Sequence, residues 1–302
     1  GIRPGGCYLE YLRHANMAIK WGNTLFVHGS MSPGAVDYIP SLDLPYTLKH
    51  SVHEVIGETL SASKGEEKEG QVQRWVSGLD MWLKSALLEY EQSDAAQTHL
   101  PLGAGKSTAE MGGRRPGQSL MCYQSNPGTL GKNVCVSSYV SRGMLRPMPV
   151  SVKEYLIEGG ISRMICGHKP IGECPLVHHD ACEPMTTSSP RRLLESIYAD
   201  TSYSDSKAKD RRGMAVSEVL IKGTPTQNQA QIHGILPDGQ RISFNLPPLG
   251  THGAVLTHND GGEDSNGSGM EKWDATIGTY TDDGYAVRAI LADQCKHGRN
   301  NP

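Results

Sequence analysis

The sequence predicts a layered protein of the α/β (α+β) class, followed by a β-hairpin extension. Three observations support this fold class. Short apolar runs that end in glycine or polar residues indicate buried strands. One long stretch with helical periodicity, residues 71–92, indicates an amphipathic helix. Beyond Gly223, alternating segments with Asp-Gly turns are typical of hairpins. We therefore expect one domain over residues 1–222 and the hairpin extension over residues 223–302.

The composition restricts the class of function. The 302 residues carry a net charge of −3 with a pI near 6.5 and contain no basic run that could track a phosphate backbone, so we expect no nucleic-acid partner. No apolar run approaches the ~18 residues that a membrane helix needs, and the first residues show no signal-peptide pattern. Seven cysteines, an odd number in a chain of this length, indicate reduced thiols. These features favour a cytoplasmic location without a membrane partner.

The first predicted elements are a strand and a long helix. The stretch "GNTLFVHG", residues 22–29, has the length and flanks of a buried strand that delivers His28 into a glycine turn. The helix over residues 71–92 has one apolar face, in which we interpret two tryptophans as core anchors. The members of this face are Val72, Trp75, Val76, Leu79, Trp82, Leu83, Ala86 and Leu87.

Residues 93–134 lose all periodicity and are rich in Gly, Pro, Ser and Thr, which predicts a flexible insert. Within this stretch, "PLGAGKST" is similar to a phosphate-binding loop. However, Leu100 occupies the position where that motif needs a glycine, and no strand precedes it. We therefore reject a nucleotide-binding role for Lys106 and Ser107.

A second junction between a strand and a histidine follows the insert. Ser151 and Glu154 are spaced as a capping box at the start of a short helix that stops at two glycines. The apolar run "ISRMIC" then leads through a glycine to His168. If this helix belongs to a crossover between two parallel strands, His28 and His168 lie at the same sheet edge, where ligands bind in open α/β sheets.

A third strand, "LLESIYAD", ends at Asp200 and Thr201. Beyond it, "AVSEVLIKG", "QAQIHGILPDGQRISFNL" and "YTDDGYAVRAIL" alternate in polarity, and the last two carry turn signals of hairpins. The stretch "HNDGGEDSNGSG" between the hairpins is typical of a polar linker.

Two imidazoles and a carboxylate at the ends of neighbouring strands indicate a metal site. Neutral histidine nitrogen suits Zn, Fe and Mn when oxygen ligands complete the coordination sphere. A lone histidine beside a glycine is more often a turn residue, so this alternative stays open. The segment "CPLVHHDAC", residues 174–182, also brings cysteines and histidines together, but its spacing matches no usual structural zinc pattern. We interpret it as a strand edge with surface histidines.

Several of these segments together resemble calcineurin-like metallophosphoesterases, the superfamily of phosphoprotein phosphatases and diadenosine tetraphosphate hydrolases. "LFVHGSMSP" is similar to the H-G-G segment of that family, and "ICGHKPIGECPLV" is similar to its later G-H-T or G-H-Q segment. "ESIYADTSYSD" and "RRGMAVSEVLI" resemble the strands that follow in bacterial-type and algal or protist-type members. The resemblance covers about residues 1–222.

The resemblance implies a β-sandwich flanked by helices that holds two metal ions, commonly Mn, Fe or Zn. In that family a hydroxide that bridges the metals attacks phosphorus. His28 and His168 match the two histidines that complete the coordination sphere of one metal, whereas Asp200 matches only a strand end and receives no ligand role. The implied substrate is a phosphorylated protein or a small phosphorylated molecule, and the implied activity is that of a hydrolase, a metallophosphatase.

The chain also departs from the family pattern. Ser30 stands where a second glycine is usual, and Lys169 stands where Thr or Gln is usual. The family motifs G-D-x-H-G, G-D-x-x-D-R-G and G-N-H-E are absent from this sequence, and "KDRRG" lies on the wrong side of both histidines. No catalytic residue is therefore identified, including the general-acid histidine, and we expect this chain alone to be nearly inactive.

Two explanations of these departures stay open. In the first, the chain is the C-terminal portion of a longer phosphatase, which agrees with its start at Gly1 and the immediate arrival of "RPGGCYLEYL". In the second, the protein is a catalytically inactive homologue that serves as a structural or interaction module. The hairpin extension would then act as a small β module.

Overall fold

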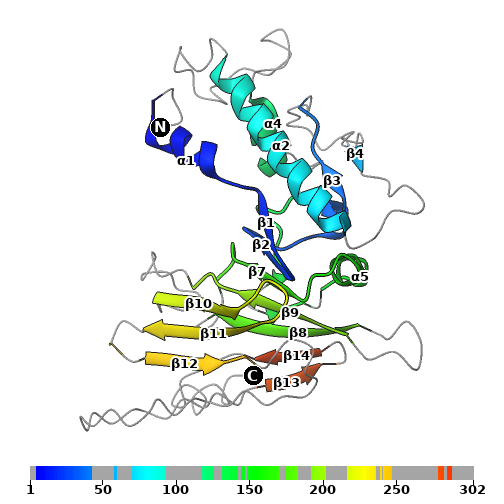
Figure 1. Cartoon of the computed structure of the whole chain (residues 1–302), viewed down its shortest axis with the longest axis vertical. Helices are drawn as coiled ribbons and strands as arrows, with labels where there is room; N and C mark the ends of the chain where they lie inside the picture. Colours follow the sequence, from blue (N-terminus) through cyan, green and yellow to red (C-terminus); the bar gives the residue numbers. More distant parts are fainter. Residues whose placement is uncertain are drawn as a thin grey trace. The chain divides into compact units, whose positions relative to one another are not determined.

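The computed structural model shows a mixed α/β protein with helices and a mixed β-sheet (Figure 1), as the sequence predicts at this level. The chain divides into two compact units, one made of residues 1–20 and 27–137, the other of residues 21–26 and 138–302. The domain boundary expected at residue 222 is a different division and stays a prediction. The structure describes residues 5–42, 58–59, 70–92, 117–125, 131–141, 144–146, 148–170, 175–182, 192–201, 216–235, 239, 241–246, 278–281 and 284–287.

The first unit is organised around one long helix, α2 (Gln71–Glu91). Its buried side chains are the eight apolar residues that the periodicity of the sequence predicted. Trp75 donates a hydrogen bond from Nε1 to the carbonyl oxygen of Tyr38, 3.2 Å away, and the ring of Trp82 lies 5.0 Å from that of Tyr123. The interpretation of both tryptophans as core anchors is therefore confirmed.

The remaining elements of this unit are short. They are α1 (Cys7–His14), η1 (Pro33–Ala35), β3 (Tyr38–Ile39), which pairs antiparallel with β4 (Glu58–Thr59), and α4 (Gln118–Ser125). Arg13 at the end of α1 forms two hydrogen bonds to the Glu91 carboxylate, 2.9 and 2.8 Å long. These bonds hold the pKa of Glu91 below its ordinary value.

The expectation of a flexible insert over residues 93–134 is wrong for its second part. Residues 118–125 form α4, in which Cys122 and Tyr123 are buried in the same core as Trp82. Val134 is also fully buried. The sequence missed this packing because one short helix with few apolar residues gives little periodic signal, and its partners come from α2. Residues 93–116, with Lys106 and Ser107, lie outside the described part.

The second unit contains a mixed sheet in which three neighbouring strands are parallel. These strands are β2 (Thr24–Val27), β7 (Arg163–Cys166) and β9 (Arg192–Tyr198), in that order across the sheet. Beyond β9 the sheet continues with antiparallel β8 (Leu176–Cys182), β14 (Gly284–Val287) and β13 (Gly278–Thr281), and β1 (Ala18–Trp21) adjoins β2 at the other end. All four residues of β7 are buried, as expected for a central parallel strand.

The parallel pairing of β2 and β7 confirms the predicted crossover between these strands. The last helix of this crossover is α5 (Val150–Glu158), which contacts β8 and β9. The predicted capping box is wrong, since the N-cap is Pro149 and no side chain caps the helix. The carbonyl oxygen of Pro149 accepts hydrogen bonds from the backbone N–H groups of Val152 and Lys153. The helix therefore begins before Ser151, which lies inside its first turn. The helix ends at Gly159, and Gly160 has a φ of +77°, as predicted for a glycine stop.

The predicted hairpins form, but they belong to two different sheets. β10 (Val216–Gly223), β11 (Asn228–Ile235) and β12 (Arg241–Asn245) make an antiparallel three-stranded sheet. The β13–β14 hairpin instead pairs with β8. A two-stranded hairpin, β5 (Val140–Ser141) and β6 (Met144–Leu145), completes the described strands. The polar linker between the predicted hairpins lies outside the described residues.

The interpretation of "CPLVHHDAC" as a strand edge with surface histidines is wrong for His178, whereas the side chain of His179 lies outside the described part. Its residues from Leu176 onward form β8, which has β9 on one side and β14 on the other. His178 is buried, with 3% of its surface exposed. β14, from a distant part of the sequence, pairs with β8 along this edge. A local sequence pattern cannot reveal such a pairing.

A buried polar cluster within the second unit joins the mixed sheet to the three-stranded sheet. Arg163, the first residue of β7, donates hydrogen bonds to Glu195 of β9 and to the Asn228 side chain at the start of β11. Asn228 in turn donates to Oδ1 of Asn23, 3.0 Å away. Arg163 is fully buried and Glu195 is 1% exposed. The cluster therefore supports a buried ion pair with neutral polar groups from a second sheet, although Nη2 of Arg163 is buried without a hydrogen-bond partner among the described residues.

The backbone of Gly22 and Asn23 lies close to the backbone of Pro225 in the turn between β10 and β11. Gly22 has a φ of +57°, and a Cβ at this position would lie 1.9 Å from the carbonyl oxygen of Pro225. The backbone N–H of Asn23 donates to that same oxygen at 3.0 Å. Glycine is thus required here for two independent reasons, the left-handed backbone and the close approach of the β10–β11 turn.

Replacing Arg163 should destabilise the protein strongly. Arg163→Ala would leave Glu195 as an uncompensated buried charge, which costs about 3–5 kcal/mol in comparable pairs. Arg163→Lys keeps a charge but cannot reach two partners with a planar fork, so we expect an intermediate loss. Urea unfolding measures both effects. Arg241→Ala, at an exposed position of β12, is the matched control and should change the free energy of unfolding little. Equal effects at positions 163 and 241 would contradict a structural role for the cluster.

Candidate functional site

The predicted site residues follow, along the chain, three neighbouring parallel strands. Phe26 of β2 is in register with Ile165 of β7, and Cys166 of β7 is in register with Tyr198 of β9. The pairing continues past the strands, because the N–H of Ala199 donates to the carbonyl oxygen of Cys166 at 2.7 Å. The next residues along the chain include His28 after β2, His168 after β7 and Asp200 after β9.

The loop that carries His28 is held by backbone hydrogen bonds within the first unit. The N–H of Gly29 donates to the carbonyl oxygen of Val134 at 2.6 Å, and the N–H of Ser30 donates to that of Ser137 at 2.7 Å. A Cβ on Gly29 would lie 2.7 Å from the Ser137 oxygen, so a larger residue does not fit without movement of the backbone. Ser30, the next residue, is accommodated and fully buried.

A side-chain turn at Asn133 shapes the segment that holds this loop. Its Oδ1 accepts hydrogen bonds from the N–H groups of Cys135 and Val136, at 3.1 and 2.9 Å, and its carbonyl oxygen accepts one from Ser137 Oγ at 2.8 Å. Asn133 is fully buried. Sequence reasoning missed this segment because it assigned residues 93–134 to a flexible insert. An asparagine followed by a serine four residues later was the available signal of a turn.

Removing the Asn133 side chain should loosen the His28 loop. Asn133→Ala leaves two backbone N–H groups without their acceptor, and we expect a loss of about 1–3 kcal/mol in the free energy of unfolding. Ser85→Ala, at an exposed position of α2 in the same unit, is the control and should leave both amides unchanged. Thermal unfolding and amide hydrogen exchange of Gly29 and Ser30 measure the effect. Unchanged exchange at these two amides in Asn133→Ala would contradict the role of the turn.

The second turn, at His168, has an uncommon backbone. His168 has a φ of +75°, a left-handed conformation that costs a non-glycine residue about 1–2 kcal/mol. Strain of this kind persists where the surrounding structure fixes the backbone, and it is concentrated at functional sites. Pro170 follows two residues later and restricts Lys169 to an extended conformation. The turn therefore presents His168 and Lys169 in a defined backbone geometry.

The donor chemistry fits a metal in part. Two imidazoles and one carboxylate are suitable ligands for Zn, Mn or Fe. Among the described residues, however, no group of three His, Cys, Asp or Glu side chains comes together in a way that could hold a metal ion. Structural and catalytic sites of this kind normally use at least three protein ligands. The described residues alone therefore do not make a complete metal site, and His28 and His168 stay predicted ligands.

Two cysteines of the first unit, Cys122 and Cys135, are buried and partly buried, respectively. Cys122 is fully buried, and burial raises the pKa of the Cys135 thiol to about 11. Burial also raises the pKa of Tyr123, whose hydroxyl oxygen accepts a hydrogen bond from the Val134 N–H. A thiol with a raised pKa is a poor nucleophile at neutral pH. These cysteines therefore act as core residues, whereas Cys7 is exposed.

The difference between these thiols can be measured by alkylation. At about pH 8, iodoacetamide should modify Cys7 readily and Cys135 much more slowly, because Cys135 is partly shielded and remains protonated. The folded thiol keeps its proton up to about pH 11, whereas the reference value is 9.0. The contribution of Cys135 to stability should therefore decline as pH rises through this window. Peptide mass spectrometry gives the rates, and equal modification of both cysteines would refute the assignment.

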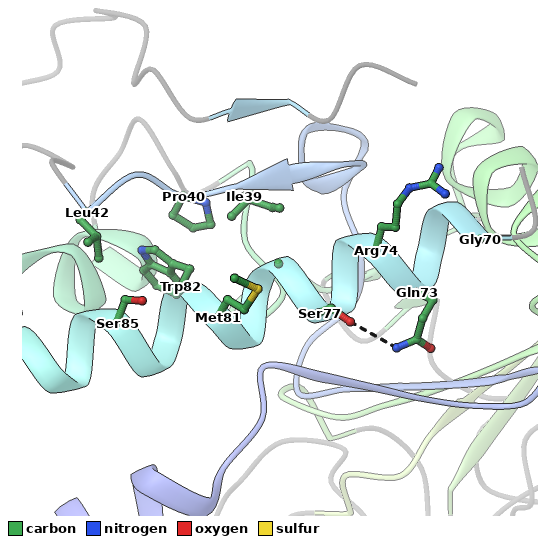
Figure 2. A pocket seen from close by; sticks show the side chains of 11 residues that line it. Ile39, Pro40, Leu42, Gly70, Gln73, Arg74, Ser77, Met81, Trp82 and Ser85 are labelled. Carbon is green, nitrogen blue, oxygen red and sulfur yellow. Dashed lines mark hydrogen bonds between the residues drawn. The ribbon is translucent and has the colours of Figure 1, made fainter. Parts of the chain in front are cut away.

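A separate groove runs along α2 in the first unit, with a volume of about 780 Å³ (Figure 2). It is mainly apolar, and Leu42, Met81 and Trp82 contribute to its walls. Gln73 donates a hydrogen bond to Ser77 Oγ at 3.4 Å, and both exposed residues belong to the lining of the groove. Of the residues drawn, Arg74 carries a charge, and none is an acid, a histidine or a cysteine. The groove has the size of a ligand pocket but holds no set of groups for acid–base or nucleophilic catalysis.

Comparison with known proteins gives no match to this chain among family models, curated proteins or solved structures. In the part of the chain that the structure describes, no helix is both long enough and apolar enough to span a membrane.

Proposed function

We propose that the protein is a metal-dependent phosphoester hydrolase of the calcineurin-like type, to whose metal centre this chain contributes His28 and His168. The observation that carries this proposal is the parallel pairing of β2 and β7, which ends both strands at one sheet edge with a histidine beyond each. Ligand sites of α/β sheets occur at such edges. The resemblance of both junctions to family motifs, in the same chain order, gives the reaction class.

The backbone around each histidine supports the proposal. The His28 loop is held by hydrogen bonds of Gly29 and Ser30, and the His168 turn is held in a left-handed conformation. Ligand residues need such fixed backbones, because a metal site depends on accurate placement of its donors. In this class the metals lower the pKa of a bound water and stabilise charge on phosphate oxygens. The substrate is a phosphomonoester on a protein or a small molecule.

The same proposal requires ligands beyond the two histidines. The described residues offer no group of three metal ligands, so the proposal needs a bridging carboxylate and a general acid from outside these residues. The chain by itself should therefore be nearly inactive. The absence of the family motifs from the sequence supports the alternative, a catalytically inactive homologue that serves as a structural or interaction module.

Metal binding separates the two proposals. We expect the chain to bind Mn²⁺ or Zn²⁺ weakly, and His28→Ala or His168→Ala to reduce the affinity by at least the ~10–100-fold typical of losing a supporting residue. Electron paramagnetic resonance of Mn²⁺ and calorimetry with Zn²⁺ measure the affinity. His14→Ala, at the exposed end of α1, is the matched control and should bind as the unaltered chain does. Hydrolysis of p-nitrophenyl phosphate should be close to the background rate.

Two results would decide against the phosphatase. If any longer version encoded by the source transcript binds metal and hydrolyses p-nitrophenyl phosphate equally well without both histidines, their assignment as ligands is wrong. If neither this chain nor such a longer version binds metal, the inactive homologue is the correct proposal.

A further inference from the structure

A group of reactive side chains lies on the sheet formed by β10, β11 and β12, all within the second unit (Figure 1). His233 of the central strand β11 is in register with Glu218 of β10 and with Ser243 of β12. Residues directly opposite each other on antiparallel strands share one face of the sheet, with Cβ atoms about 4.5–5.5 Å apart. The sheet therefore places a carboxylate, an imidazole and a hydroxyl in one row across its three strands.

The serine and the histidine of this row are hydrogen-bonded to each other. The distance between Ser243 Oγ and His233 Nδ1 is 3.1 Å, which is within the reach that a serine nucleophile and its general base need. Both residues are partly exposed, whereas Ala230 and Ile232, which alternate with His233 along β11, are fully buried. The row therefore lies on the face of the sheet that a substrate from solvent can contact.

The glutamate lies on the other side of the imidazole. Glu218 is exposed, and its carboxylate has no hydrogen bond or ion pair with another described residue. It is therefore available to accept a hydrogen bond from an N–H group of His233. A carboxylate beside an imidazole favours the proton on the ring nitrogen that faces it, which leaves the other nitrogen to accept a proton. Glu218 is thus placed to hold His233 in the tautomer in which Nδ1 accepts the Ser243 proton.

The next row of the same face suits an apolar acyl group. Val216 is in register with Ile235, and these residues lie two positions along the strands from Glu218 and His233. Their exposed fractions are 50% and 46%, so apolar surface lies beside the row. Arg241 is in register with Ile235, and a cation on this face favours negative charge that develops on a carbonyl oxygen. The face thus combines a nucleophile and its base with an apolar contact and a positive charge.

We propose that Ser243 and His233 hydrolyse carboxylic esters with a short apolar acyl group, with Glu218 as the residue that positions the imidazole. Ser243 Oγ forms a bond to the carbonyl carbon and gives its proton to Nδ1 of His233. The bond between that carbon and the alcohol oxygen breaks, and His233 returns the proton to the leaving alcohol. Water then attacks the acyl-serine by the same route, which releases the carboxylic acid and restores the hydroxyl. This activity goes beyond the proposed phosphatase and uses none of its predicted ligands.

Covalent labelling and ester hydrolysis test the inference with the full 302-residue chain in EDTA, which keeps metal-dependent hydrolysis out of the measurement. One probe is a fluorophosphonate, which loses fluoride when an activated serine attacks its phosphorus. The other is p-nitrophenyl butyrate. The variants are Ser243→Ala, His233→Gln and the matched control Ser217→Ala, and circular dichroism verifies that each is folded. Ser217 belongs to β10 of the same sheet, but it lies on the opposite face.

Peptide mass spectrometry should locate the phosphonyl group on Ser243 of the unaltered chain. Ser243→Ala should lose this label and the burst of p-nitrophenol that formation of an acyl-enzyme gives. His233→Gln should react about 100-fold more slowly with both probes, which is the lower end of the contribution of a positioned general base. Ser217→Ala should behave as the unaltered chain does.

Further variants separate positioning of the imidazole from binding of the substrate. Glu218→Gln should lower kcat and leave KM unchanged, and Glu218→Asp, which keeps the carboxylate, should restore part of the rate. Val216→Ser should raise KM for p-nitrophenyl butyrate about fourfold, as the loss of one methylene contact does. The same change should leave KM for p-nitrophenyl acetate unaltered, because the shorter acyl group does not reach the apolar pair.

Several results would overturn the inference. Absence of the label from Ser243 in the unaltered chain is one, and equal hydrolysis by Ser243→Ala is another. If hydrolysis is lost in His233→Gln but kept in Ser243→Ala, an isolated imidazole reacts with the ester and the serine does not. Failure of Mn²⁺ binding refutes the proposed metal centre alone, since labelling of Ser243 in EDTA does not depend on a metal.

Discussion

The second unit depends on one buried interaction, the guanidinium of Arg163 between Glu195 and Asn228. Arg163 starts β7, Glu195 lies on β9 and Asn228 starts β11, so a single side chain connects two strands of the mixed sheet with the three-stranded sheet. A buried ion pair adds little net stability, because desolvation offsets its attraction. However, the hydrogen bonds of Arg163 require Glu195 and Asn228 at defined positions, so the interaction favours one pairing and one register of the strands that carry them.

This constraint acts at the opposite end of the strands from the candidate site. Arg163 lies at the amino end of β7, and His168 follows its carboxyl end. Glu195 is in register with Arg163, so the ion pair fixes the parallel register that brings the residues after β7 and β9 to the same edge. A shift by one residue would turn every side chain to the other face. The ion pair that stabilises the sheet thus lies at one end of these strands, and the predicted site residues follow the other end.

At the candidate site, backbone hydrogen bonds provide the rigidity that side chains provide at the other end. Gly29 and Ser30 are held by carbonyl groups of residues 134 and 137, and Asn133 shapes that segment. The arrangement fixes the His28 loop and uses its N–H groups. In the second unit, the left-handed turn at His168 precedes the exposed Lys169.

The sequence by itself determined the features that arise from local periodicity and turn chemistry. It gave the mixed α/β class, the eight buried residues of α2, the glycine stop of α5, the two hairpins and the strand that leads to each histidine. Only the tertiary structure decided the burial of α4, the central position of β8, the cluster around Arg163 and the segment that supports His28. Each of these depends on partners distant along the chain, such as Asn228 for Arg163 and β14 for β8. Periodicity records which face of an element is buried, but it holds no information about which distant element covers that face.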